Sequence, residues 1–226
     1  DLLRFMPKYT SLSSRSANIW LWQLTESSEQ LLALLPTHLD YASQVQQFRS
    51  MQRQREWLAT RLLMHDILGD NIGIAYNEHG APFLVSKEDY ASLEDIRFKP
   101  NEKRVFPTLS ISHSHQWVAI ALGTNLQPIG LDLEVISEKA ARVQHKFLSA
   151  EEQRLLSPTF TPTALWCAKE ATYKLCNHPG LLFLDQMRLY NKEGQIMVEL
   201  PTLQRDVLIE TGRFMDCAFA VAQFAE

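Results

Sequence analysis

Two motifs place charged residues in apolar surroundings, and the chain must fold so that these charges find partners. The motifs are Gly130-Leu131-Asp132-Leu133-Glu134, in a strand-like segment, and Trp166-Cys167-Ala168-Lys169-Glu170-Ala171-Thr172-Tyr173-Lys174, in a helix-like one. Burying a charge is costly unless the charge is paired or coordinated. Acids and lysines in such segments therefore indicate a site that holds a metal ion and a phosphate.

The composition limits the class of protein. The 226 residues are 46% hydrophobic and 21% charged, which is ordinary for a globular chain with a sizeable core. The net charge of -4 argues against a general nucleic-acid binder, which would normally be basic. No run of about 18 apolar residues indicates a membrane span.

The cysteines point to a reducing environment. The chain has 3 of them, Cys167, Cys176 and Cys217, and they form no C-x-x-C pair. The pattern supports neither a disulfide framework nor a zinc site. We therefore expect a cytoplasmic protein.

Hydrophobic periodicity predicts a mixture of helices and strands. Helices are expected at 29–35, 41–68, 149–156 and 162–176, and strands at 19–24, 72–76, 82–85, 108–112, 117–122, 129–135, 187–190, 195–200, 207–211 and 216–224. Residues 86–104 are expected to form a polar loop with a short helix. Ser149 and Glu152 have the spacing of a capping box.

The order of these elements predicts an α+β fold of two similar lobes. Each lobe would pack a small antiparallel sheet against a long helix, which makes the chain a pseudo-dimer. Residues 1–123 would form the N-terminal lobe and residues 128–226 the C-terminal lobe. Two complementary halves in one chain favour a monomer.

Asp132 and Glu134 are the first candidate site residues. Side chains alternate along a strand, so both acids lie on one face while Leu131 and Leu133 lie on the other. Adjacent acids repel each other unless a cation lies between them, and such oxygen ligands suit Mg²⁺. The alternative is an acidic, solvated strand edge.

Glu170 and Lys174 are four residues apart and share a face of the predicted helix. They could form an ordinary surface ion pair, which contributes about 0.2–0.5 kcal/mol. Alternatively, Glu170 could complete a metal site with the strand acids or act as a general base.

The segment 110–115 and the arginines of 41–68 are candidate phosphate ligands. A polar corner at His113-Ser114-His115-Gln116 would expose hydroxyl, imidazole and backbone N–H groups. Arg49 and Arg53 lie one turn apart, and planar guanidinium groups suit bidentate phosphate contacts. A plain polar turn and a solvated helix face are the alternatives.

Together, and in this order, the motifs resemble those of the 4'-phosphopantetheinyl transferase superfamily, in its two-lobed, surfactin-synthetase-activating type. The matching segments are Ser110-Ile111-Ser112-His113-Ser114, Ile129-Gly130-Leu131-Asp132-Leu133-Glu134, Lys146-Phe147-Leu148-Ser149-Ala150-Glu151-Glu152 and Trp166-Cys167-Ala168-Lys169-Glu170-Ala171-Thr172-Tyr173-Lys174. The second and fourth motifs are specific as a pair. The resemblance extends over nearly the whole chain.

The resemblance implies an enzyme of the holo-[acyl-carrier-protein] synthase type. Such an enzyme moves the phosphopantetheine arm of coenzyme A to a serine of an apo acyl- or peptidyl-carrier protein and releases adenosine 3',5'-bisphosphate. Asp132, Glu134 and Glu170 correspond to the Mg²⁺ ligands. Glu170 is also the residue expected to deprotonate the carrier serine, and Lys174 the one expected to contact the diphosphate.

The resemblance also implies coenzyme A contacts in the first half of the chain. Ser112 and His113 correspond to phosphate contacts, with His113 toward the 3'-phosphate. Arg61 is near a position where the family often has a basic residue for the nucleotide, and Arg55 is a second candidate. Lys169 belongs to the motif without an assigned role.

One position departs from the family. Where the family often has Gly-Lys-Pro after the first hairpin turn, this chain has Gly80-Ala81-Pro82, and Ala81 cannot contact a phosphate. This leaves two other hypotheses open. One is a catalytically silent protein that binds coenzyme A or a carrier protein, and the other is a metal-dependent phosphohydrolase.

Carrier proteins are generally acidic around the modified serine, so a basic patch is expected on this chain. Lys139, Arg142 and Lys146, with the apolar Phe147 and Leu148 close by, are the candidate patch. A solvated charged loop has the same pattern. The sequence does not distinguish fatty-acid, polyketide and peptide-synthetase carriers.

Overall fold

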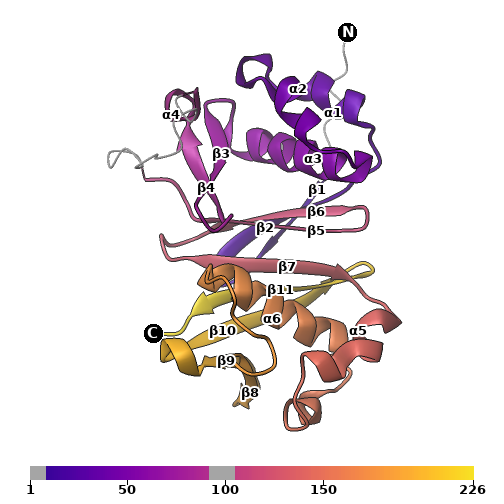
Figure 1. Ribbon diagram of the computed structural model, residues 1–226, viewed down its shortest axis with the longest axis vertical. Helices are drawn as coiled ribbons and strands as arrows, with labels where there is room; N and C mark the ends of the chain where they lie inside the picture. The colour runs from indigo at the N-terminus through magenta and orange to yellow at the C-terminus, as the bar shows by residue number, and fades with distance from the viewer. Residues whose placement is uncertain (1–8, 92–104) are drawn as a thin grey trace.

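The computed structural model describes residues 9–91 and 105–226 (Figure 1). Within these residues the chain is α+β, as expected, and its paired strands are antiparallel. A four-stranded sheet has the order β1-β2-β6-β5. Its strands are β1 (Tyr9–Ser13), β2 (Ala17–Gln23), β5 (Leu109–Ser114) and β6 (Trp117–Gly123).

The second half of the chain forms a five-stranded sheet of order β7-β11-β10-β9-β8. Its strands are β7 (Ile129–Val135), β8 (Arg188–Lys192), β9 (Gln195–Leu200), β10 (Arg205–Phe214) and β11 (Cys217–Phe224). A separate hairpin pairs β3 (Ile72–Tyr76) with β4 (Pro82–Ser86). The sequence-based strands match these elements, except that β1 was not predicted.

The helices lie mainly outside the two large sheets (Figure 1). The α-helices are α1 (Ser28–Leu34), α2 (Tyr41–Gln44), α3 (Met51–Leu68), α4 (Lys87–Ala91), α5 (Glu138–Val143) and α6 (Pro162–Cys176). Short 3₁₀ turns occupy Thr37–Leu39, Val45–Gln47, Gln144–Lys146, Glu152–Leu155 and Pro201–Leu203. Within the described residues, no helix combines the length and the apolar character needed to cross a membrane.

Two helix predictions were wrong in extent. The helix expected over 41–68 is broken, because Phe48 is extended (φ -94°, ψ 122°) and Ser50 caps a new helix by accepting a bond from Arg53. The segment 149–156 contains only a 3₁₀ turn. Ser149 and Glu152 nevertheless exchange the two capping-box bonds. The loop predicted at 86–104 contains α4, and residues 92–104 lie outside the described residues.

The polar corner predicted at 113–116 is smaller than expected. His113 and Ser114 belong to β5, and only His115 and Gln116 connect it to β6. Because strand side chains alternate, Ser110, Ser112 and Ser114 therefore lie on one face of β5. This face becomes important at the site.

Three buried clusters hold the layers together. Leu58 of α3 and Ile120 of β6 belong to the cluster on the outer side of the four-stranded sheet. Ala119 and Leu131 belong to the cluster that contains side chains of both large sheets. Ala168 of α6 belongs to the cluster on the other side of the five-stranded sheet. The two halves thus share a buried core.

Candidate active site

One cavity contains most of the residues that the sequence singled out. Its volume is about 1020 Å³, which is large enough for a cofactor-sized ligand. Helix α3, the β3–β4 hairpin and β5 contribute Glu56, Trp57, Arg61, Tyr76, Ala81, Ser112 and His113 to its lining. Strand β7 and helix α6 contribute Asp132, Glu134, Glu170, Tyr173 and Lys174. Both halves of the chain therefore build the cavity.

The predicted alternation on β7 is correct. Leu131 and Leu133 are fully buried in the core shared by the two large sheets, while Asp132 and Glu134 line the cavity. Asp132 is itself buried, with 5% of its surface exposed. Its Oδ1 accepts a hydrogen bond from Ser112 Oγ at 3.1 Å. Its Oδ2 is buried and has no hydrogen-bond partner among the described residues.

Lys174 is bonded to Asp132 and not to Glu170. Its Nζ lies 2.9 Å from Asp132 Oδ1, and it also donates to the carbonyl oxygens of Ile111 at 3.2 Å and Leu131 at 2.9 Å. The close packing of α6 on β7 depends on Gly130, because a Cβ there would overlap the carbonyl oxygen of Ala171. The i, i+4 surface pair considered from the sequence is therefore replaced by a pair between two elements.

Glu134 and Glu170 have raised pKa values. Burial is the main reason that the pKa of Glu134 lies above its ordinary value. Burial, with the charge of Asp132 as the next cause, raises the pKa of Glu170 to about 7. A raised pKa is what a carboxylate needs if it is to accept a proton near neutral pH. The charge of Asp132 contributes to both increases in pKa, so a nearby cation would offset part of the repulsion between these acids.

The donor chemistry at this end of the cavity fits Mg²⁺. Carboxylate oxygens are its usual protein ligands. Asp132 Oδ2, which has no hydrogen-bond partner among the described residues, is an oxygen that could coordinate the ion. Across residues 9–91 and 105–226, however, no three His, Cys, Asp or Glu side chains are arranged so that they could hold a metal ion. The acids are neighbours but not a finished coordination group.

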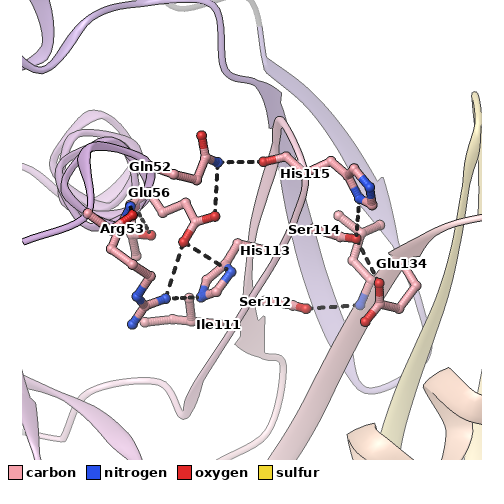
Figure 2. Close-up of polar contacts among 12 residues, drawn as sticks. Gln52, Arg53, Glu56, Ile111, Ser112, His113, Ser114, His115 and Glu134 are labelled. Carbon is pink, nitrogen blue, oxygen red and sulfur yellow. Dashed lines mark hydrogen bonds and ion pairs between the residues drawn. The ribbon is translucent and has the colours of Figure 1, made fainter.

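His113 belongs to a network that crosses from β5 to α3 (Figure 2). Its Nδ1 lies 3.3 Å from Glu56 Oε2, and its Nε2 lies 2.6 Å from Nη1 of Arg53. Glu56 also accepts bonds from Arg53 at 3.2 Å and from Gln52 at 3.0 Å. Burial lowers the pKa of His113, which favours the neutral imidazole.

Comparison with known proteins supports the resemblance read from the motifs. Residues 128–212 match the family model described as the 4'-phosphopantetheinyl transferase superfamily. Over these residues the chain is similar to this superfamily. It is 30% identical over 142 residues to "4'-phosphopantetheinyl transferase Sfp" of Bacillus subtilis (strain 168). That match covers 57% of this chain and 62% of the Bacillus protein, so the chain spans less than two thirds of that relative's length.

The two candidate arginines have different environments. Arg61 lines the cavity with 2% of its surface exposed, and its guanidinium carbon lies 3.4 Å from the centroid of the Trp57 ring. Its Nε is buried without a hydrogen-bond partner among the described residues. Arg55 instead donates to the carbonyl oxygens of Glu26 at 2.7 Å and Leu24 at 3.2 Å. The structure brings Arg61 to the cavity and uses Arg55 to join α3 to the segment after β2.

Lys169 points away from the cavity. Its fully buried Nζ lies 2.7 Å from Glu152 Oε1 and donates to the carbonyl oxygens of Phe183 and Met187. Glu152 also accepts a bond from the backbone N–H of Leu189. The lysine of the motif thus fixes the segment between α6 and β8, which answers the question that the sequence left open.

Sequence reasoning missed Glu56, although it named the neighbouring Arg53 as a candidate phosphate ligand. Both lie on α3, and Glu56 is buried, with 6% of its surface exposed. Glu56 directly precedes the apolar pair Trp57-Leu58, which was the available signal. Ser112 differs from its predicted role in another way, because its hydroxyl proton is donated to Asp132. A hydroxyl has only one proton to donate.

Proposed function

We propose that this protein transfers the 4'-phosphopantetheine arm of coenzyme A to a serine of an apo carrier protein and releases adenosine 3',5'-bisphosphate. The main observation in support of this proposal is that one cavity is lined by His113 and by Asp132, Glu134, Glu170 and Lys174. The superfamily match and the name of the Bacillus relative support the same reaction.

In this reaction the carrier serine oxygen bonds to the phosphorus that bears the pantetheine arm. The bond from that phosphorus to the bridging diphosphate oxygen breaks, and its electrons leave with adenosine 3',5'-bisphosphate. We assign Glu170 to take the serine proton, directly or through a water. Lys174 would offset negative charge on the diphosphate, which is the main requirement of phosphoryl transfer.

We propose that Asp132, Glu134 and Glu170 hold the Mg²⁺ of this reaction. Their oxygen donors and the unpaired Asp132 Oδ2 support the assignment. When bound, Mg²⁺ would supply positive charge to the leaving diphosphate.

The nucleotide end of coenzyme A would occupy the part of the cavity near α3. His113 and Arg61 are our candidates for its phosphate contacts. The buried guanidinium of Arg61 donates to the Trp57 carbonyl oxygen at 3.2 Å and to the Tyr76 hydroxyl at 3.4 Å, while its Nε is unpaired. Among the described residues it has no carboxylate partner, and a buried cation without one favours an anionic ligand. Arg53 lies beside His113 and would add positive charge at the same place.

The division into two similar lobes, 1–123 and 128–226, is also a proposal. It would place the coenzyme A phosphate contacts in the first lobe and the metal acids in the second. For the carrier protein we propose a basic surface of Lys139, Arg142 and Lys146, which are exposed. Phe147 and Leu148 are buried in the core, so this surface would attract the carrier by charge and not by those apolar side chains.

Mass spectrometry of an apo acyl-carrier protein mixed with this protein, Mg²⁺ and coenzyme A tests the proposal. A mass gain equal to the phosphopantetheine arm, abolished by EDTA, is the expected result. Coenzyme A binding with no gain on carriers of the fatty-acid, polyketide and peptide-synthetase types would favour a silent binding protein instead. Phosphate release from a nucleotide without any carrier would favour a phosphohydrolase.

A further inference from the structure

Three serines of β5 bond to the edge of β7. The hydroxyls of Ser110, Ser112 and Ser114 accept the backbone N–H groups of Leu131 at 2.8 Å, Leu133 at 3.0 Å and Val135 at 3.2 Å. We call these three residues the serine ladder. Strands β5 and β7 are edge strands of different sheets, so side-chain hydroxyls replace the backbone acceptors that an adjacent strand would normally provide.

Two members of the ladder have a second bond. Ser112 Oγ donates to Asp132 Oδ1 at 3.1 Å. Ser114 Oγ donates to Glu134 Oε2 at 2.7 Å (Figure 2). Each of these hydroxyls is fixed by a backbone N–H and directs its proton at an acid. Such a bond restricts the torsions of the carboxylate, which is otherwise free to rotate.

Ser110 repeats the backbone bond without the acid. The residue of β7 that corresponds to Asp132 and Glu134 at its level is Gly130, which has no side chain. Among the described residues, the Ser110 hydroxyl has no carboxylate partner. Ser110 therefore serves as an internal control: it joins the two strands without orienting an acid, whereas Ser112 and Ser114 do both.

We propose that Ser112 and Ser114 are positioning residues that fix the carboxylates of Asp132 and Glu134 at the end of the cavity where these acids would take up Mg²⁺. The inference rests on the proposed function, because it assigns a metal to these acids. It means that β5, in the first half of the chain, sets the geometry of acids that belong to the second half. Residues that orient metal ligands typically change metal affinity by about 10- to 100-fold when they are replaced.

The test compares Ser110→Ala, Ser112→Ala and Ser114→Ala in the full chain. The Mg²⁺ concentration that gives half-maximal transfer is measured, and Mn²⁺ affinity in the presence of coenzyme A is measured by electron paramagnetic resonance. In Ser112→Ala and Ser114→Ala we expect the half-maximal Mg²⁺ concentration to rise about 10-fold and the Mn²⁺ affinity to fall about 10-fold. In Ser110→Ala both quantities should stay within about twofold of the wild type. Ser110→Ala should lose the least thermal stability, since it loses one bond between the strands and each of the other two variants loses two.

Two further variants separate orientation from folding. Ser114→Thr keeps the hydroxyl and should restore metal affinity. Ser114→Ala should have no additional effect on Mn²⁺ affinity in a Glu134→Ala background, because the acid that it orients is gone. The inference is overturned if the metal affinities of the Ser112 and Ser114 variants equal that of Ser110→Ala. A wild-type protein that neither transfers the arm nor binds Mn²⁺ would instead overturn the proposed function.

Discussion

Lys174 of α6 lies 2.9 Å from Asp132 of β7, measured from Nζ to Oδ1, and this pair links the two charged motifs of the sequence. The contact joins residues that are 42 positions apart in the chain. Gly130 makes it possible by allowing the helix backbone to approach the strand. One of the acids is therefore paired with a lysine, while Glu170, one turn before that lysine, keeps a raised pKa.

Asp132→Ala and Glu170→Ala should each reduce the rate of transfer by at least about 100-fold, because each removes charge stabilisation at the phosphorus. Transfer is followed by the mass of the carrier protein, and circular dichroism checks the fold. Glu138→Ala, at an exposed position of α5, is the control and should transfer normally. Near-wild-type transfer in both test variants would contradict the site assignment.

Arg61→Met should raise the KM for coenzyme A about 10-fold, equal to about 1.4 kcal/mol, because the cavity loses a buried cation. Arg55→Met is the matched control, since its guanidinium bonds to backbone carbonyls outside the cavity. It should lower the urea midpoint of unfolding and leave the KM unchanged. Equal KM values for the two variants would remove Arg61 from the proposed coenzyme A site.

Ala81→Lys should lower the KM for coenzyme A about threefold, which is the effect expected of a partly exposed ion pair on affinity. Ala81 lines the cavity at the turn of the β3–β4 hairpin, so a lysine there would reach toward a bound phosphate. The effect should diminish in high salt because the contact is electrostatic. Ala81→Met adds similar length without charge, and an equal effect from this control would argue against a phosphate contact.

Lys169→Met should reduce the free energy of unfolding by about 3–5 kcal/mol, because it leaves the Glu152 carboxylate buried without its cation. The measurement is urea denaturation of both proteins. Lys192→Met, at an exposed position of β8, should change the same quantity by less than about 0.5 kcal/mol. A small loss in Lys169→Met would show that other groups satisfy Glu152.

Stability should fall as the pH drops below about 6.5, in part because of His65. Its Nε2 lies 2.8 Å from the hydroxyl of Tyr41 and its Nδ1 lies 3.1 Å from the carbonyl oxygen of Gly69. Burial lowers the pKa of His65, so the unfolded chain binds more protons than the folded chain between the two pKa values. Folding is then favoured above this window and disfavoured within it.

His65→Gln should flatten this pH dependence, measured as urea midpoints between pH 5 and pH 8. His79→Gln, on the exposed β3–β4 turn, changes the same residue type and should leave the slope unchanged. A slope that is equal in the wild type and His65→Gln would rule out this residue as a cause.

Local patterns were the most predictable features of the fold. Helix α6 begins at Pro162, after the cap residue Thr161, and ends at Cys176, as its periodicity indicated. The β3–β4 hairpin and the alternation of β7 were also foreseen. Each depends on neighbours within a few residues, so the sequence contains the necessary information. The break at Phe48 and the 3₁₀ turn near Ser149 were missed, because packing overrode a pattern that also suits a longer helix.

The sequence by itself determined which residue types were available to the site and which side of each element they occupy. Spacing placed Asp132 with Glu134 on one face and Glu170 with Lys174 on another. Tertiary structure alone decided the partners: Asp132 for Lys174, Glu56 for His113, and the serine ladder for the edge of β7. The reason is physical, because periodicity fixes direction within one element, whereas a contact depends on how closely two elements can pack.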